Sequence, residues 1–382
     1  MKSLSFIDAL KDADITFFTG VPDSYLHGFC SALQEKTSST ENIITANEGN
    51  AIGVAAGYHL ATSKTPLVYM QNSGLGNAIN PLVSLACEEM LGIPMILLIG
   101  WRGDPCHPDH IQHALQGRIT PLILQDLGIP FRTLQDDESA IRETVQWAAR
   151  EADSRESPIA ILVPKGVLSG TKHPPNDTSY PLSREEAIGA ILDSAPQEAL
   201  ISATTGRASR ELFHISEARK EGHSKDYLNV GSMGHASSVA LGIALANPDR
   251  QVICLDGDSA AIMHMGALTM PSKLAIPNLL HVILNNGAHE SVGGQPSAGQ
   301  LIDFTKIADS CGYRTVGEPA MTKSGVIEAV QKLCACDEAG FLDVRIRSGM
   351  RSDMPGLEIA PKLMRDELMM DIRAFRSSEK LS

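Results

Sequence analysis

Short runs of apolar, mostly β-branched residues recur along the chain, separated by turn residues and by stretches with helical spacing. Such runs predict buried strands. In the first half of the chain they lie at 15–18, 43–46, 67–70, 95–99 and 159–163. In the second half they lie at 199–203, 227–230, 252–255, 280–284 and 341–346. Because strands alternate with helices in both halves, the pattern predicts an α/β fold with two doubly wound parallel sheets.

A stretch from Pro164 to Pro181 separates the two halves and is rich in Pro, Gly, Ser and Thr. Its lack of an apolar period is typical of an interdomain linker. We therefore expect a first domain over 1–165, a linker over 166–182, a second domain over 183–350 and a C-terminal tail over 351–382. The tail is rich in Met and in charged residues, and its pattern leaves a docked helix and a frayed end both open.

Three local predictions place the motifs discussed below. A run of small residues predicts a helix from Glu48 to Ala61, and a second helix is expected from Ala260 to Leu268. The polar segment from Trp101 to Gly117 reads as a loop. Ser183, followed three residues later by Glu186, predicts a capping box at the first helix of the second domain.

Composition and charge narrow the class of protein. The 382 residues are 43% hydrophobic and 20% charged, which is typical of a soluble globular enzyme. A formal net charge of −13 argues against nucleic acid and anionic membranes as partners. The odd number of cysteines, 7, without a C-x-x-C pair, favours free thiols in the cytoplasm. The first residues do not form a secretory signal, and the most apolar window, 93–101, is too short to span a bilayer.

The stretch 251–295 contains the strongest candidate chemistry. The strand at 252–255 ends in Asp256-Gly257-Asp258-Ser259, and the strand at 280–284 ends in Asn285-Asn286-Gly287. Ligands of parallel sheets bind at the carboxyl ends of strands, so Asp258 and the Asn pair could face one ion. Their oxygens, with backbone carbonyl and N–H groups, suit a magnesium-bound diphosphate. One such turn alone is often just a helix cap, but two turns one strand–helix–strand unit apart are more specific.

These two loops resemble the motif of thiamine-diphosphate-dependent enzymes, in which Gly-Asp-Gly is followed at this distance by Asn-Asn. The segment from Asn285 to Pro296 is more specific and resembles the phosphonopyruvate and sulfopyruvate decarboxylases. One position departs from the motif: Ser259 stands where the family has Gly. Serine keeps the backbone N–H group and adds a hydroxyl, so we expect diphosphate binding to be retained.

The resemblance implies thiamine diphosphate and Mg²⁺ as cofactors. It implies that Glu48 hydrogen-bonds the aminopyrimidine of the cofactor, that Met233 supports its bent conformation, and that the Gly231 carbonyl accepts from the aminopyrimidine. The alternatives are a carboxylate at a helix N-terminus for Glu48 and a core side chain for Met233. The implied cofactor-binding residues are Glu48, Gly231, Ser232, Met233, Gly257, Asp258, Ser259, Ala260 and Asn286, and the implied metal ligands are Asp258, Asn286 and Ala288.

The resemblance also covers three segments of the first half, at 19–24, 71–73 and 101–113. Arg102 is a candidate clamp for a phosphonate or carboxylate, because a guanidinium binds such anions through two N–H groups. His113 and His289 are candidate catalytic residues beside Glu48, since imidazole titrates near neutrality. A surface arginine and structural histidines are the alternatives. The implied substrate-binding residues are Asp23, Ser24, Gln71, Asn72, Arg102 and Gln112. Cys106-His107-Pro108 departs from the family pattern.

The resemblance therefore implies decarboxylation of 3-phosphonopyruvate, an anionic 2-oxo acid, to phosphonoacetaldehyde and carbon dioxide in phosphonate biosynthesis. Sulfopyruvate as the substrate, a related carboligase and an inactive partner subunit remain open alternatives. In this family one subunit holds the pyrimidine end of the cofactor and another holds the diphosphate. We therefore expect a homo-oligomer, at least a dimer, with the active site at the subunit interface.

Overall fold

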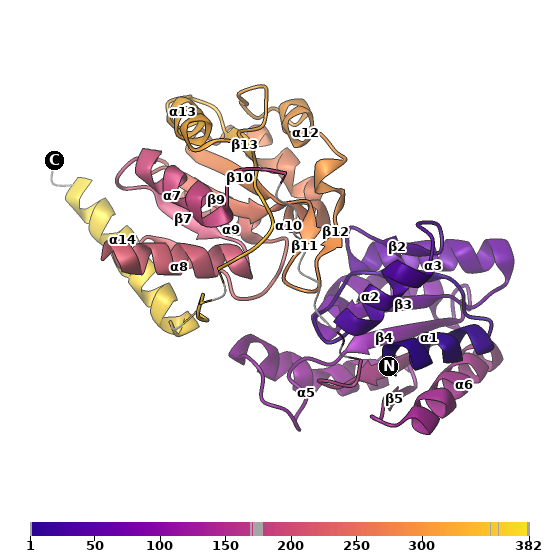
Figure 1. The fold of residues 1–382 in the computed structure, drawn as a ribbon. Coiled ribbons are helices and arrows are strands. Elements are labelled where there is room, and N and C mark those ends of the chain that lie inside the picture. Colours follow the sequence, from indigo (N-terminus) through magenta and orange to yellow (C-terminus); the bar gives the residue numbers. More distant parts are fainter. Residues whose placement is uncertain (1, 169, 171–178, 352, 358, 380–382) are drawn as a thin grey trace. The chain divides into compact units, whose positions relative to one another are not determined.

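A computed structural model describes residues 2–168, 170, 179–351, 353–357 and 359–379 of the chain (Figure 1). The chain divides into two compact units, Met1–Pro174 with His289–Gln295, and Pro175–Ala288 with Pro296–Ser382. Residues 169 and 171–178 of the predicted linker lie outside the described part of the chain.

The first unit is built on a six-stranded sheet with the order β2-β1-β3-β4-β6-β5. All of its strand pairs are parallel. The central strands are almost entirely apolar, which is typical of parallel strands covered on both faces. The strands are β1 Phe18–Gly20, β2 Asn42–Ile44, β3 Leu67–Gln71, β4 Met95–Gly100, β5 Phe131–Thr133 and β6 Pro158–Val163.

Helices cover both faces of this sheet (Figure 1). Alternate strand residues point to opposite faces, so Tyr69 packs with α1, α2 and α6, whereas Val68 and Met70 pack with α3, α4 and α5. The helices are α1 Lys2–Asp12, α2 His27–Lys36, α3 Glu48–Thr62, α4 Leu75–Pro81, α5 Ile111–Asp126 and α6 Glu138–Arg155, with a 3₁₀ turn η1 Asn72–Gly74 and a π-helical turn η2 Leu82–Ala86.

The second unit repeats this architecture with a five-stranded parallel sheet in the order β13-β10-β9-β7-β8. One face packs against α7, α8 and α13, and the other against α9, α10 and α12. The strands of this sheet are β7 Leu200–Ala203, β8 Asp226–Leu228, β9 Val252–Gly257, β10 Leu279–Asn285 and β13 Gly340–Arg345. A two-stranded ribbon, β11 Ala288–His289 with β12 Gln295–Pro296, follows β10.

The helices of the second unit are α7 Arg184–Ser194, α8 Arg207–Arg219, α9 Ala236–Ala246, α10 Asp258–Met263, α11 Met270–Lys273, α12 Phe304–Ser310, α13 Lys323–Cys334 and α14 Pro361–Glu379, with 3₁₀ turns η3 Met265–Thr269 and η4 Ala298–Gln300. The predicted capping box of Ser183 and Glu186 is present at the start of α7. With both sheets parallel and both doubly wound, the predicted fold class is confirmed.

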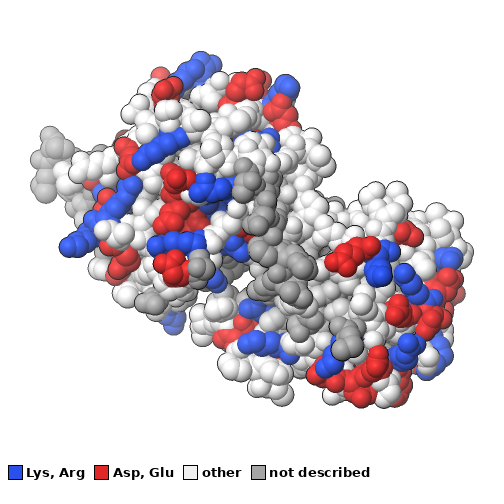
Figure 2. All heavy atoms as spheres, viewed as in Figure 1, with Lys and Arg blue, Asp and Glu red and all other residues white. Residues whose placement is uncertain are grey.

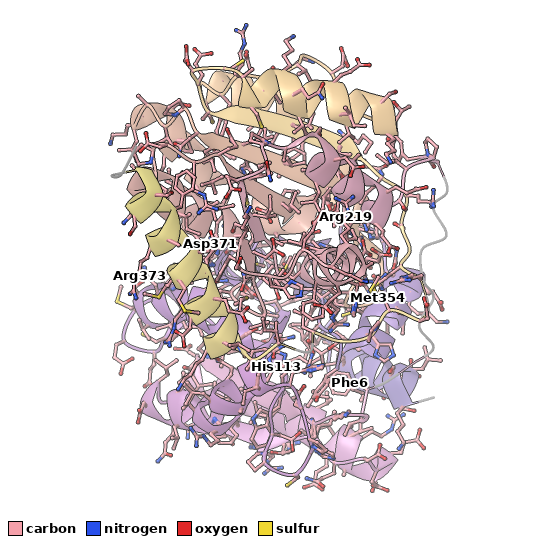
Figure 3. All side chains as sticks on the ribbon, turned by 90° about the vertical axis from the view of Figure 1, so that its left-hand side faces the viewer. Phe6, His113, Arg219, Met354, Asp371 and Arg373 are labelled. Atoms are coloured by element: carbon pink, nitrogen blue, oxygen red, sulfur yellow. The ribbon has the colours of Figure 1, made fainter. Side chains whose placement is uncertain are left out.

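The C-terminal segment forms a docked helix, one of the two outcomes that its sequence left open. Met364 and Leu368 of α14 are buried against the second unit. Arg250, which is 2% exposed, donates to Asp371 of α14 at 2.7 Å and stacks on the Phe375 ring at 4.6 Å. Asp371 is labelled on the yellow helix in Figure 3. A buried cation that lost these partners would be costly, so we infer that α14 is an integral part of the second unit.

Two local predictions are wrong in their extent. The segment 101–117 is not a loop throughout, because α5 begins at Ile111. Its buried residues begin only at Gly117, and Ile111 and Leu115 are exposed, so its first turns carry no apolar period. The helix expected at 260–268 ends at Met263 and continues as the 3₁₀ turn η3.

Acidic and basic side chains are interspersed over the face drawn in Figure 2. Because the formal net charge is −13, the overall field does not attract anions, and an anionic ligand must be held by individual side chains at its site. None of the helices in the described part of the chain is long and apolar enough to cross a bilayer.

Candidate functional site

The carboxyl ends of β2, β1, β3 and β4 lie along one edge of the first sheet. The register pairs Gly20 with Tyr69 and Gln71 with Gly100, so the loops that follow begin at similar heights. In parallel sheets this edge is where ligands bind. The loops and helix starts at this edge carry Asp23, Ser24, Glu48, Gln71, Asn72 and Arg102.

Glu48 is the first residue of α3, and Asn47 caps the helix by accepting from the Asn50 amide at 3.0 Å. The Glu48 side chain is buried, with 4% exposure, and its Oε2 accepts from Asn77 Nδ2 at 2.8 Å. Burial raises the pKa of the Glu48 carboxyl above its usual value, and the Asn77 hydrogen bond opposes part of that rise. Such a carboxyl is suited to sharing a proton with a weak base near neutral pH.

Asp23 lies next to β3 and is fully buried. Its Oδ1 accepts from Gln71 Nε2 at 2.6 Å and its Oδ2 from the Tyr25 amide at 2.8 Å. The absence of a side chain at Gly100 makes room for it, because a Cβ there would overlap Asp23 Oδ2. Burial raises the pKa of Asp23, and the hydrogen bond from Gln71 is the largest opposing effect.

Arg102 follows β4 and is held rigidly by a side chain that the sequence analysis did not identify. Its Nε and Nη2 donate to the two oxygens of Asp109 at 2.7 and 2.6 Å, and its Nη1 donates to Ser24 Oγ at 2.9 Å. The guanidinium lies 4.7 Å from the centre of the Tyr25 ring. A guanidinium has five N–H groups, and these hydrogen bonds use three of them, which leaves one on each terminal nitrogen.

Asp109 is itself saturated with donors. Besides Arg102, its oxygens accept from the Tyr25 hydroxyl at 3.0 Å and from the Gly103 and His110 amides at 2.9 and 2.8 Å. Burial alone would raise the pKa of Asp109, but these hydrogen bonds, led by that of Arg102, hold it well below its usual range. Asp109 is therefore a permanent anchor that orients Arg102, and the two remaining N–H groups of Arg102 can bind an anion.

Asn72 fixes the backbone at Arg102. Its Nδ2 donates to the Arg102 carbonyl at 2.9 Å, and its Oδ1 accepts from the Arg102 amide at 3.1 Å. The predicted Gln112 is exposed on α5 and is not part of this cluster, whereas Gln116, one turn further, donates to the Asn72 carbonyl at 3.0 Å. Gln112 and Gln116 are four residues apart and therefore lie on the same face of α5. A helix predicted to start at Ile111 would have made Gln116 a candidate beside Gln112.

The two predicted histidines lie in different settings. His113, labelled in Figure 3, is half-buried on α5. Burial, followed by the charge of Arg102, lowers its pKa to about 4. His289 is in β11, and desolvation lowers its pKa to about 4 as well. Both imidazoles are therefore neutral at pH 7, where each carries one N–H donor and one acceptor nitrogen.

In the second unit, the two predicted diphosphate loops lie at the ends of adjacent strands. Gly257 of β9 pairs with Leu284 of β10, so Asp258 and the Asn pair follow at the same edge. Asp258 is 2% exposed, and Ser297 donates its hydroxyl to Asp258 Oδ2. Burial raises the pKa of Asp258 to about 6. Ser297 in turn accepts from the Gly299 amide at 3.0 Å.

Asn285 and Asn286 have different surroundings. Asn285 is fully buried, donates to the Gly299 carbonyl at 2.8 Å and to Asp343 at 3.3 Å, and accepts from the Gly287 amide at 3.2 Å. The side-chain amide of Asn285 is therefore used in hydrogen bonds within the protein interior. The Asn286 oxygen accepts from the Ala288 amide at 3.2 Å, which places Ala288 beside Asn286 in the turn.

The segment from Gly231 to Met233 forms the turn between β8 and α9. Asn229 Oδ1 accepts from the Gly231 amide at 3.1 Å, and Ser232 adopts a left-handed conformation with φ of 48°. Met233 is half-buried and is absent from the apolar core clusters of the second unit. It therefore differs from a core methionine, which was the alternative interpretation of this residue.

Two observations indicate that residues of the second unit suit a magnesium-bound diphosphate. Asp258 and Asn286 supply the carboxylate and amide oxygens that Mg²⁺ prefers. Next to Asp258, the hydroxyl oxygen of Ser259 is buried and has no hydrogen-bond partner among the described residues, so it can donate to an added acceptor. Ala260, also buried, follows directly.

Comparison with protein families agrees with this arrangement. Residues 3–122 match the family described as "Thiamine pyrophosphate enzyme, N-terminal TPP binding domain", and residues 204–344 match "Thiamine pyrophosphate enzyme, C-terminal TPP binding domain". The first match contains Glu48, and the second contains Asp258 and Asn286. The chain belongs to the thiamine pyrophosphate enzymes, and thiamine pyrophosphate is another name for thiamine diphosphate.

The curated relatives narrow the class within that family. A phosphonopyruvate decarboxylase of Streptomyces viridochromogenes is 31% identical, over 97% of this chain and 93% of the relative. A phosphonopyruvate decarboxylase of Streptomyces hygroscopicus is also 31% identical, over 96% and 92%. A sulfopyruvate decarboxylase of Methanosarcina acetivorans is 27% identical, over 97% of both chains. The chain is thus a decarboxylase, a carboxy-lyase, as the sequence predicted.

Proposed function

We propose that the chain decarboxylates 3-phosphonopyruvate to phosphonoacetaldehyde and carbon dioxide, with thiamine diphosphate and Mg²⁺ as cofactors, as a step of phosphonate biosynthesis. The observation that carries this proposal is the fixed guanidinium of Arg102, whose two remaining N–H groups suit a tetrahedral anion. Identity of 31% to phosphonopyruvate decarboxylases over nearly the whole chain supports it.

Residues of the chain would have the following roles in the reaction. Bound thiamine diphosphate supplies the carbon nucleophile and the electron sink for decarboxylation. The Glu48 carboxyl would hold the proton shared with the aminopyrimidine nitrogen, while Gly231 and Met233 orient the rings. His113 and His289, neutral at pH 7, would exchange protons or hydrogen-bond with the reacting 2-oxo acid.

The anionic head group would bind between Arg102 and Ser24. Asp23 lies close enough to Arg102 to interact with its charge, and its raised pKa makes protonation easier when an anion approaches. Gln71 and Asn72 hold these groups in place by the hydrogen bonds described above. A phosphonate and a sulfonate both offer oxygens to such a fork, so sulfopyruvate remains the second candidate substrate, supported by the relative from Methanosarcina acetivorans.

The test of function is aldehyde formation from phosphonopyruvate and sulfopyruvate, measured side by side. The protein is first stripped of cofactor and then restored with thiamine diphosphate and Mg²⁺. We expect cofactor-dependent turnover with a higher kcat/KM for phosphonopyruvate. Turnover of sulfopyruvate alone would replace the substrate in the proposal. Turnover of neither, despite cofactor binding, would favour a carboligase or an inactive partner subunit.

The proposed metal role is tested at Asp258. Asp258→Ala removes a buried oxygen ligand, so we expect magnesium-dependent binding of thiamine diphosphate to weaken by at least about 100-fold. Calorimetric titration at several Mg²⁺ concentrations measures this loss. Asp303→Ala is a matched control, because Asp303 also lies at the start of a helix of the second unit but is paired with Lys306 at the surface. Undiminished binding by Asp258→Ala would refute the metal role.

Gly74 gives a second test, directed at Glu48. A Cβ at position 74 would overlap the Glu48 carboxyl, so Gly74→Ala is expected to displace that side chain. We expect turnover to fall by about 10-fold or more, because displacements of about 1 Å in an active site can cost 10²-fold. Gly76→Ala is the control, since a Cβ there meets open space. Equal kcat values for the two variants, both with the wild-type unfolding temperature, would contradict this prediction.

We also propose that the chain acts as a homo-oligomer of at least two copies with the active site at the subunit interface. The support is the family pattern, in which two subunits complete one cofactor site.

A further inference from the structure

Ser259 carries a buried hydroxyl that the family pattern does not explain. The residue is 8% exposed, and its Oγ has no hydrogen-bond partner among the described residues. Buried polar groups are nearly always hydrogen-bonded, so such a group needs an explanation. The family motif has Gly at this position, and a glycine has no side chain to make a contact there.

The local backbone does not provide an acceptor. A serine in a helix can donate to the carbonyl four residues earlier, which for Ser259 is that of Leu255. Leu255 belongs to β9, its carbonyl accepts from the Thr204 amide at 2.8 Å, and Ser259 Oγ makes no hydrogen bond to it. Ser259 is the second residue of α10 and directly follows Asp258, the proposed metal ligand, so it belongs to the loop that would hold the diphosphate.

We propose that the Ser259 hydroxyl donates a hydrogen bond to a diphosphate oxygen of the cofactor. This inference rests on the proposed function. Diphosphate oxygens accept hydrogen bonds and do not donate when ionised, and a serine hydroxyl can rotate to meet them. A hydrogen bond to a charged oxygen is among the stronger ones in proteins. The contact supplements the backbone N–H group that serine shares with the motif glycine.

The test compares the binding of thiamine diphosphate to wild type and Ser259→Ala, measured by calorimetric titration at fixed Mg²⁺. Alanine retains the Cβ and removes only the hydroxyl. We expect the dissociation constant to rise by about 10-fold or more, as is typical for hydrogen bonds to charged groups. The same fold-change is expected for magnesium pyrophosphate, which has the diphosphate oxygens but no rings. Ser259→Gly restores the family residue and should show the same loss.

Ser272→Ala is the matched control. The hydroxyl of Ser272 on α11 is also buried without a partner among the described residues, but it belongs to a different helix from the diphosphate loop. We expect this variant to bind thiamine diphosphate and magnesium pyrophosphate like the wild type. The unfolding temperature of each variant without cofactor shows whether the fold is retained.

The outcomes separate the two proposals. Equal affinity of wild type and Ser259→Ala for thiamine diphosphate would overturn the role of the hydroxyl. A loss for thiamine diphosphate but not for magnesium pyrophosphate would overturn it too, because the effect would then arise at the rings. If the wild type bound no thiamine diphosphate at all, the proposed function itself would fail.

Discussion

Replacing Glu48 by Gln is expected to reduce decarboxylation by about 10²–10⁴-fold, the range typical for loss of a group that exchanges a proton in catalysis. Glutamine has nearly the same shape and can still accept from Asn77 through its amide oxygen. It cannot take up or release a proton. Affinity for thiamine diphosphate should therefore stay within about tenfold of the wild type, since one neutral hydrogen bond contributes little net free energy.

Two measurements check this prediction. Aldehyde formation under saturating cofactor reports turnover. Hydrogen–deuterium exchange at the thiazolium carbon of the bound cofactor, followed by NMR, reports the proton-transfer step without substrate. Both should slow together in Glu48→Gln, because both depend on the proton held by the carboxyl.

Glu138→Gln is the matched control for the helix-dipole alternative. Glu138, like Glu48, is the first residue of a helix whose N-cap side chain accepts an amide hydrogen bond, but it is exposed at the surface. If Glu48 acted only on the helix dipole, both substitutions would cost a similar small amount of stability and leave turnover intact. Full activity of Glu48→Gln would therefore refute its assignment as the proton-sharing residue.

The residues at the carboxyl ends of the strands could be predicted well, because each strand is recognised from its own local sequence. Parallel strands covered on both faces must be apolar along their length, so the run from Val252 to Leu255 could be recognised directly. Because Gly257 pairs with Leu284 in adjacent parallel strands, Asp258 and Asn286 follow at the same edge of the sheet. The helix from Glu48 was predictable from its own local sequence, since small residues predominate from Ala51 to Gly57.

The residues that the sequence analysis missed depend on contacts that no periodic pattern in the sequence indicates. Asp109 meets Arg102 because of the path of an irregular loop, which has no apolar period to indicate it. Ser297 reaches Asp258 from 39 residues away. The side-chain amide of Asn285 donates to the Gly299 carbonyl, and no local sequence pattern indicates this partner. These pairings are set by tertiary structure, and residue type alone does not determine them.

The second large effect is expected for Arg102→Lys. A lysine keeps the positive charge but has a single ammonium group, which cannot bind Asp109 through two N–H groups and also present two further N–H groups to a substrate. We expect kcat/KM for phosphonopyruvate to fall by about 10²-fold or more, mainly through KM, because the head group then loses its fixed partner. Affinity for thiamine diphosphate should not change.

Pyruvate separates anion recognition from general damage to the site. It has the same 2-oxo acid group but lacks the phosphonate, so the reduced turnover of pyruvate should be nearly equal in wild type and Arg102→Lys. Arg132→Lys is the control for replacing a stacked arginine, because Arg132 lies 4.5 Å from the Trp147 ring at an exposed position. A similar loss for phosphonopyruvate and pyruvate would mean that Arg102 supports the fold of the loop and does not select the anion. In that case the saturated Asp109 would remain the anchor of that loop, and the group that recognises the phosphonate would have to be another cation.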